Sequence, residues 1–246
     1  MWDVLRDNWL LLLIGQYPHG PLGGLSLTFI IAILGLVLSF PLAILLALAR
    51  LSPFRLIYYP AFALIQVVRG LPFLMFIFWV YFFLPAITGK AISGFTTLVC
   101  ALIIYECAYL SEIIRGGIEA LPEGQMAAAR SLGLGYFKAM RGVILPQALY
   151  NVLPSLVSQF VSTIKETSLG YVISVHELTF AANQINSVLL TKPAEVYGIL
   201  AITYFLLCFT LTQIARRVDR MITRKRGGGG PRGGEQDMVP AESKPA

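Results

Sequence analysis

The feature that most constrains this chain of 246 residues is a series of long apolar runs that carry very few charges. Leu22–Ala49 contains no charged residue, and neither does Val196–Ala215. A helix needs about 20 apolar residues to cross the hydrocarbon core of a bilayer. These runs therefore predict membrane-spanning helices rather than the core of a water-soluble domain.

Three further segments qualify as spans or nearly do. Ile57–Pro85 has one charge, Arg69, and Ala91–Ser111 has one, Glu106. The last candidate begins near Pro146 and stays apolar and hydroxyl-rich for about 20 residues. We therefore expect an all-α integral membrane protein with about five transmembrane helices.

The composition excludes several classes of protein. The chain is 57% hydrophobic and 13% charged, with a mean hydropathy of +0.73. Soluble globular chains carry about 25% charged residues. A water-soluble enzyme, a disordered protein and a nucleic-acid binder are therefore excluded as leading classes. The formal net charge of +6 comes from basic clusters between apolar runs, which is the pattern that membrane topology produces.

The basic residues also predict the orientation in the membrane. The larger groups lie at Arg50–Arg55, Arg115–Arg141 and Arg216–Arg226, and all three fall on one side if each apolar run crosses once. Loops rich in Lys and Arg stay in the cytoplasm. Five spans then place the N-terminus outside and the C-terminus in the cytoplasm.

Two end segments differ from the apolar body. Residues 1–21 contain Trp2 and Trp9 and a short apolar run, which predicts an interfacial helix on the outer membrane surface. Residues 22–215 form the expected transmembrane domain. Residues 216–246 begin with a basic cytoplasmic end and continue as a glycine-rich tail with almost nothing to pack, which predicts disorder.

The longest cytoplasmic connection, within residues 115–146, is patterned like a folded element. Pro122 and Glu123 suit the first turn of a helix. Ala127–Ala129 favour helix and present a face without bulk. Gly133 then supplies a left-handed stop. We expect a first short helix that ends at this glycine.

A second short helix is expected at about Tyr136–Ile144, ending before Pro146 because the residue ahead of a proline avoids the helical region. Two short helices joined by a glycine turn would form a cytoplasmic knob that another protein could grip closely. The alternative is an ordinary loop between two spans.

Several motifs resemble one transporter family. Gly124–Gly133 reads Gly-Gln-Met-Ala-Ala-Ala-Arg-Ser-Leu-Gly, and Ile144–Ala148 reads Ile-Leu-Pro-Gln-Ala. This pair resembles the EAA loop of ATP-binding-cassette (ABC) importer permeases, in the version of the polar amino-acid uptake family with its histidine, glutamine and glutamate/aspartate permeases. Val68–Pro72, Ala108–Gly117 and Lys165–Leu169 agree with it, and the resemblance covers about residues 22–220.

The resemblance implies the type I ABC importer permease fold, with residues 22–215 as the permease domain and 115–146 as its EAA-type coupling loop. Ala127 stands where the family usually has the glutamate of the motif. The residues expected to couple to an ATPase are Gly124, Ala127, Ala128, Arg130, Gly133, Leu145 and Pro146.

The resemblance also implies a transporter of several chains in a bacterial inner membrane. It would contain ATPase subunits, a second permease subunit that is identical or paralogous, and an extracytoplasmic solute-binding protein. The sequence has no G-x-x-x-x-G-K-[ST] phosphate loop. We therefore expect a transport subunit that is not itself an enzyme and binds no cofactor, while the partner ATPase uses ATP and magnesium.

Polar residues inside the spans are candidates for the solute pathway, because charges at membrane depth are costly and usually functional or paired. Asn151, Ser155, Ser158, Ser162 and Lys165 share one helical face by their spacing. This face lines a water-filled pathway or packs against a partner subunit. The full candidate set is Glu106, Ser158, Ser162, Lys165, Glu166, Thr167 and Ser168.

Charge chemistry assigns roles within this set. Lys165 suits an amino acid's carboxylate, and Glu106 or Glu166 suits its ammonium group. The alternative is that Lys165 and Glu166 cap the outer end of the span or pair with protein groups. The block Tyr105–Tyr109 has an acid at its second position, which by resemblance favours glutamate or aspartate as the solute.

Three further features involve charged residues. Arg69, Gly70 and Pro72 resemble the family's kink element, where Arg69 has a structural role, reaches toward the cytoplasm or contacts solute. Glu112 and Arg115 are spaced to pair on a helix. His176 and Glu177 have no second histidine at metal-ligand spacing, so we expect a surface pair and no metal site.

Two other functions compete with the importer interpretation. An intramembrane enzyme would need a nucleophile with a base, or a metal set, and the sequence has neither motif. An ion-coupled secondary carrier or channel would work without an ATPase. Such carriers usually contain internal repeats, and five spans do not divide into equal halves.

Overall fold

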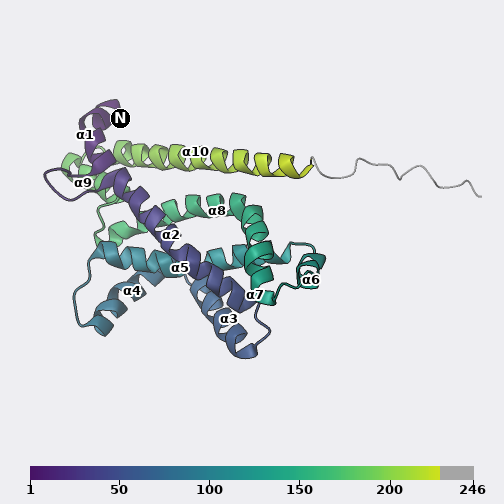
Figure 1. Cartoon of the computed structure of the whole chain (residues 1–246). Coiled ribbons are helices and arrows are strands. Elements are labelled where there is room, and N and C mark those ends of the chain that lie inside the picture. The colour runs from purple at the N-terminus through teal and green to yellow at the C-terminus, as the bar shows by residue number, and fades with distance from the viewer. Residues whose placement is uncertain (228–246) are drawn as a thin grey trace, which may run out of the picture.

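The computed structural model describes residues 1–227, and this part of the chain is almost entirely helical (Figure 1). Residues 228–246, which hold most of the predicted tail, lie outside the described range. The elements in chain order are α1 (Trp2–Ile14), α2 (Gly24–Arg50), α3 (Arg55–Gly70), α4 (Phe73–Thr88), α5 (Gly94–Glu119), α6 (Gly124–Ser131), α7 (Tyr136–Ala139), the π-helix η1 (Met140–Ile144), α8 (Leu145–Thr167), the 3-10 helix η2 (Ser168–Ile173), α9 (Leu178–Leu189) and α10 (Pro193–Gly227).

The apolar helices confirm an all-α membrane protein. By length and composition α2, α5 and α10 can each cross a membrane, and α3 with α4 makes a fourth span if the bent pair counts as one. The fifth expected span is α8, which has 23 residues but carries the polar stripe and is not among the apolar helices. The count from hydropathy is therefore three or four in the described residues, against about five expected.

The span expected at Ile57–Pro85 is two helices rather than one kinked helix. α3 ends at Gly70 and α4 begins at Phe73, with an angle of 110° between them. Leu71 between them has φ −100° and ψ 138°, an extended conformation. A residue ahead of a proline is pushed out of the helical region, so Pro72 breaks the span instead of bending it.

The expected stop before Pro146 is wrong. α7 runs into the π-helix η1 and then directly into α8, with Pro146 in the first turn of α8. The N–H of Leu145 donates to the carbonyl of Met140, five residues back. A proline in a first turn needs no N–H, and the widened π turn ahead of it keeps the chain helical.

α5 is the central helix of the bundle. It packs against α2, α3, α4 and α8, and α10 lies along α8 (Figure 1). Gly35 of α2 lies where a β-carbon would be only 3.1 Å from the side chain of Leu102 in α5. The missing side chain lets α2 and α5 approach closely.

The two ends of the molecule have different elements. α1 and α9 gather at one end, together with the start of α2, while α6 and α7 lie at the opposite end (Figure 1). α1 is anchored by its buried residues Val4 and Leu12, whereas Trp2 and Trp9 are exposed. This exposure is consistent with the interfacial role expected for residues 1–21.

Glu177 is a buried cap at the α1 end, so the expected surface pair is wrong. Its side chain is fully buried and accepts hydrogen bonds from the N–H groups of Thr179 and Phe180, at 2.8 and 2.9 Å. The hydroxyl of Tyr204 in α10 donates to the same carboxyl at 3.1 Å. Glu177 therefore starts α9 and fastens it to α10, a contact that helix spacing alone does not reveal.

Burial raises the pKa of Glu177 from 4.5 to about 7, against the opposing effect of its hydrogen bonds. Between these two values the folded chain holds a proton that the unfolded chain has released, so stability falls as the pH rises. Wild type should therefore lose stability relative to Glu177→Gln as the pH rises from 5 to 8, and the Tm difference between the two should shift in favour of Glu177→Gln. The change in the relative free energy of unfolding is on the order of 3 kcal/mol.

Thermal unfolding of the purified protein in detergent measures this difference. The exposed Glu123→Gln is the matched control and should follow the wild-type pH profile. A constant Tm difference between Glu177→Gln and wild type across this range would contradict the assignment.

Candidate functional site

α8 has an exposed face and a buried face. The predicted stripe lies on the exposed face, where Ser155, Ser158 and Lys165 are open on the single chain. On the neighbouring face Thr163 is fully buried against α5, and Gln159 is half-buried beside it. The stripe is therefore available to a partner subunit or a pathway, whereas the other face is already used inside the chain.

Glu106 of α5 is the buried acid at the centre of this contact. Its Oε1 accepts a hydrogen bond from Thr163 Oγ1 at 2.7 Å, and its Oε2 accepts one from Gln159 Nε2 at 3.0 Å. Glu106 is fully buried. A buried carboxyl must be hydrogen-bonded, so these two donors from α8 make the α5–α8 contact specific.

Glu166 lies about one helical turn beyond Thr163, on the same side of α8 as Gln159. Within residues 1–227 its Oε2 is buried and has no hydrogen-bond partner. Two neighbouring carboxyl groups with one unpartnered oxygen form an acceptor-rich site. Such a site suits a cationic or ammonium group.

The structure divides the predicted pathway residues into two groups. Glu106 and Glu166 lie together on the α5–α8 side, while Ser158 and Lys165 point to the open face and Ser162 is half-buried. The remaining two predicted residues, Thr167 and Ser168, bond within their own chain segment. The hydroxyl of Thr167 donates to the carbonyl of Ile164 at 2.7 Å, and that of Ser168 donates to the carbonyl of Lys165 at 2.6 Å.

Thr163 is the site residue that the sequence analysis missed. A pattern that could have revealed it is the series Gln159, Thr163 and Glu166, which follows spacings of four and three on the face next to the serines. A second missed feature is the contact between the hydroxyl groups of Tyr105 and Tyr109, 3.2 Å apart beside this cluster.

The break between α3 and α4 carries a cation. The guanidinium of Arg69 lies over the ring of Tyr109, with 5.1 Å from its carbon to the ring centroid. A β-carbon at Gly70 would have no neighbour within 4 Å, so close packing does not explain this glycine. Of the three kink residues, Pro72 acts on the backbone and Arg69 binds α3 to α5.

The expected first helix of the coupling loop is present as α6. It ends at Ser131, and Gly133, two residues later, has a φ of +84°, the left-handed conformation expected for it. The N–H of Leu134 donates to the carbonyl of Ala129, and that of Gly133 to Arg130. The glycine therefore closes the helix as a C-cap and turns the chain toward α7.

The residues expected to couple to an ATPase lie mostly on one accessible surface. Ala129 is the buried residue of α6. Two large apolar side chains that follow this helix are exposed: Leu132 at 84% and Phe137 at 74%. An exposed apolar patch beside small residues is typical of a protein-contact site. The coupling residues on the exposed surface are Gly124, Ala127, Ala128, Arg130, Gly133 and Pro146, while Leu145 is half-buried.

A groove of about 630 Å³ with mixed polar and apolar walls lies beside this surface. It runs between the link from α5 to α6 and the start of α8, and its walls include Pro122, Gln125, Gln147 and Tyr150. The groove joins Pro146 to the α6 region, although these residues belong to different helices.

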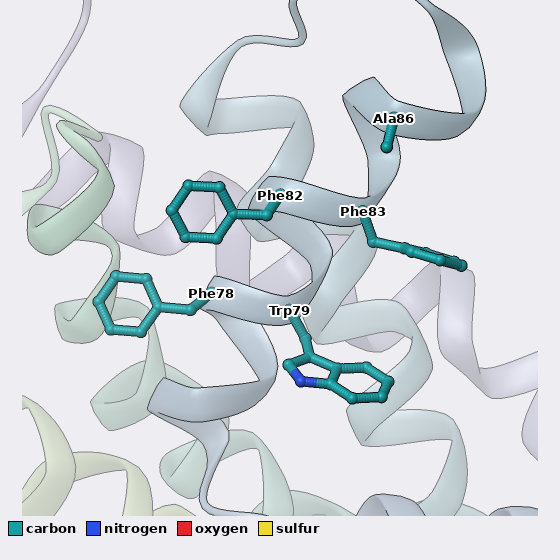
Figure 2. Close-up of a pocket in the computed structure, with 5 residues that line it drawn as sticks. All are labelled: Phe78, Trp79, Phe82, Phe83 and Ala86. Carbon is teal, nitrogen blue, oxygen red and sulfur yellow. The ribbon is translucent and has the colours of Figure 1, made fainter.

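α4 carries an aromatic hollow of about 450 Å³ on its outer surface (Figure 2). Phe78 and Phe82 project together on one side of the helix, and Trp79 and Phe83 lie on another. The remaining lining residue is Ala86. With no titratable or charged group in its lining, this hollow suits lipid contact rather than recognition of a polar solute.

Residues 39–224 match the family described as binding-protein-dependent transport system inner membrane component. The chain belongs to this family. It is a permease subunit of an ABC importer for amino acids, and a partner ATPase hydrolyses the ATP. It is a transport component and not an enzyme.

Individual proteins agree with the family assignment. The inner membrane amino-acid ABC transporter permease protein YhdY of Escherichia coli K12 is 35% identical over 83% of this chain and 57% of its own length. The chain therefore spans little more than half of YhdY. The probable glutamine ABC transporter permease protein GlnP of Bacillus subtilis 168 is 34% identical, over 84% of this chain and 97% of that protein.

A solved structure confirms the type I importer fold. The crystal structure of an amino acid ABC transporter with histidines superposes with a TM-score of 0.73 at 36% identity. The match covers 80% of this chain and 92% of the solved chain.

The buried pair between α5 and α8 gives a stability prediction for this permease. Thr163→Val keeps the shape of the side chain but removes the hydroxyl that donates to Glu106. The buried carboxyl then loses one of its two donors, and we expect a destabilisation of about 1–3 kcal/mol. Thermal unfolding of the detergent-solubilised permease measures the loss.

Ser158→Ala is the matched control on the same helix. Its hydroxyl is exposed and donates only to the carbonyl of Pro154 in its own helix, so the Tm should change little. Equal effects of the two substitutions would contradict the distinction between the faces of α8.

Proposed function

We propose that this permease takes a polar amino acid from an extracytoplasmic solute-binding protein and passes it across the inner membrane with a second permease subunit. ATPase subunits drive the step through the coupling loop. The observation that carries the proposal is α6, an exposed helix of small residues closed by the left-handed Gly133.

The geometry of α6 suits a rigid docking element. Ala127 and Ala128 are exposed and give a partner close access to the helix backbone. Arg130 lies in the last turn and is exposed, so it supplies a charge where Ala127 does not. Nucleotide binding shifts a transporter between states only through contacts that differ between those states, and a stiff helix transmits such differences.

The solute pathway in this proposal runs along the exposed face of α8. Ser158 and Ser162 offer hydroxyl groups along it, and Lys165 offers a positive charge for a carboxylate. Glu166 lies at the edge of this face with its Oε2 buried and unpartnered, so in this proposal it accepts from an ammonium group only after α5 and α8 separate, whereas Glu106 is already hydrogen-bonded twice. The same face can also contact the second permease, so the pathway lies at the subunit boundary.

The exposure of Arg69 suggests that the α3–α4 break also lies at the boundary with the second permease subunit. Its side chain is exposed on the single chain although it lies in the middle of the expected span 57–85. A charged side chain facing hydrocarbon is costly. We therefore place Arg69 against water or the partner permease rather than against lipid.

The solute class rests on charge chemistry and on the relatives. The name of GlnP specifies glutamine, and the solved transporter is described with histidines. Glutamate and aspartate remain our first candidates because of the Tyr105–Tyr109 block. The contacts of Glu106 do not oppose them, since its carboxyl faces α8 rather than open space.

The proposed orientation follows the basic clusters. The end with α6 and α7 is placed in the cytoplasm, and the end with α1 and α9 faces outside, next to the solute-binding protein. α1 then lies at the outer interface with Trp2 and Trp9 at the headgroup level.

Uptake by the reconstituted transporter tests the proposal. The complete complex in proteoliposomes should accumulate labelled glutamate, aspartate or glutamine only with ATP and the solute-binding protein. Alanine at Gly133 must adopt a left-handed backbone, which costs about 1–2 kcal/mol. We expect Gly133→Ala to lower ATP-dependent uptake by about 5- to 30-fold if this strain opposes docking.

Gly116→Ala is the matched control, since a β-carbon there also meets nothing within 4 Å but the residue lies inside α5. Its uptake should equal that of wild type. Uptake that persists without ATP would support an ion-coupled carrier instead. Wild-type uptake by Gly133→Ala would remove the coupling role of α6.

A further inference from the structure

One carboxylate joins two helices at the α6 end of the bundle. Arg50 is the last residue of α2, and its Nε donates a hydrogen bond to Oε1 of Glu112 in α5 at 3.3 Å. Oε2 of Glu112 accepts from Nη2 of Arg115 at 2.8 Å, so the expected Glu112–Arg115 pair is present. Nη1 of Arg115 then reaches Glu119 at 2.5 Å.

Arg50 extends this network to a third helix. Its guanidinium carbon lies 4.8 Å from the ring centroids of both Tyr58 and Phe62 in α3. The two rings are parallel within 4°, so one cation sits on two aromatic faces. The side chains of Arg50 and Glu112 are only 10% and 17% exposed, so water weakens this pair less than it weakens a surface ion pair.

α3 has few other anchors. Only Ala61, Ile65 and Val68 are buried along its length, and Leu56 is 88% exposed. The other anchor is Arg69 over Tyr109 of α5, described above. Tyr109 and Glu112 are three residues apart on α5 and share one side of it. Two cation contacts thus hold α3 to α5 at both of its ends, one of them through α2.

We propose that Glu112 is the positioning residue that makes α3, and with it the break at Pro72, follow α5 when the ATPase moves the coupling loop. The inference rests on the proposed function of α6. α5 ends at Glu119 and α6 begins at Gly124, so displacement of the loop acts directly on this end of α5, as it does on α8 through η1.

The residue type matters because both oxygens of Glu112 accept from arginines. Glutamine keeps the volume but offers one oxygen and one NH₂ group. The NH₂ group would face an arginine donor, so one of the two links is lost. Glu112→Gln therefore separates the connection between helices from the space that the side chain fills.

The complete transporter in proteoliposomes tests the role, with uptake and ATP hydrolysis measured together. Mutations along coupling networks change coupling by about 2- to 30-fold. We expect Glu112→Gln to lower the amino acid transported per ATP within that range, while the rate of ATP hydrolysis stays near wild type. An unchanged ratio in a folded Glu112→Gln complex overturns the proposal.

Substitutions at Arg50 add a rescue test. Arg50→Lys keeps a donor for Glu112 and a cation for the rings, so it should retain most of the coupling. Arg50→Gln should behave like Glu112→Gln, and the double variant should be no worse than either single one. Fully additive losses would show that the two residues act independently and would contradict the proposal.

Glu119→Gln is the matched control on the same network. Glu119 is 52% exposed and contacts only Arg115 among the charged groups here, so its loss leaves the connection between α2, α3 and α5 intact. Its transport per ATP should stay at the wild-type value.

A distance measurement provides a readout that loss of stability alone would not change. Spin labels at the exposed positions Leu56 in α3 and Ile104 in α5 report whether the two helices move together. In wild type the distance should be equal with and without ATP, and in Glu112→Gln it should shift or broaden with ATP. Wild-type distances in the variant would overturn the proposal. If wild type itself shows no ATP-driven uptake, the proposed function has failed instead.

Discussion

The pairing of charged and polar groups on α5 is the interaction on which the rest of the structure depends. α5 is apolar enough to cross a bilayer, where an unpaired carboxylate is costly, yet it carries Glu106 and Glu112. Glu106 is satisfied by Thr163 of α8, and Glu112 by Arg50 of α2. Because each acid needs a donor from a different helix, these pairs specify which helices surround α5.

This arrangement separates the molecule into a hub and peripheral elements. α5 contacts α2, α3, α4 and α8, and it also leads directly into the coupling loop. The broken pair α3–α4 is attached to α5 through an apolar core that includes Ile65 and Ile77 and, in addition, through cation and aromatic contacts, whereas α8 is attached through the buried Glu106 cluster. In the proposed coupling, a displacement of α6 reaches the α3–α4 break through α5, and it reaches α8 both through α5 and through the continuous helix formed by α7, η1 and α8. The Glu177 cap holds α9 to α10 at the opposite end.

Much of the fold and part of the site could be predicted from the sequence. The left-handed stop at Gly133 was predictable because glycine is favoured at that position after a helix, and the Glu112–Arg115 pair because both residues lie on one helix. The span 57–85 was found as an apolar run, but its 110° break depends on how both halves pack on Tyr105 and Tyr109. Glu177 was expected at the surface, because the contact with Tyr204 of α10 that helps to bury it is not visible in the sequence.

The amino-acid sequence by itself determined that this chain is a helical membrane protein, where its main apolar helices lie and that a small-residue loop closed by glycine lies between two of them. Hydropathy, helical period and glycine geometry are local properties, so nearby residues are enough to specify them. Only the tertiary structure decided which face of α8 is buried, which acids are paired and which helices share Glu112. Those pairs join residues 53, 57 and 62 positions apart, and their distances depend on how the helices cross rather than on any pattern within one helix.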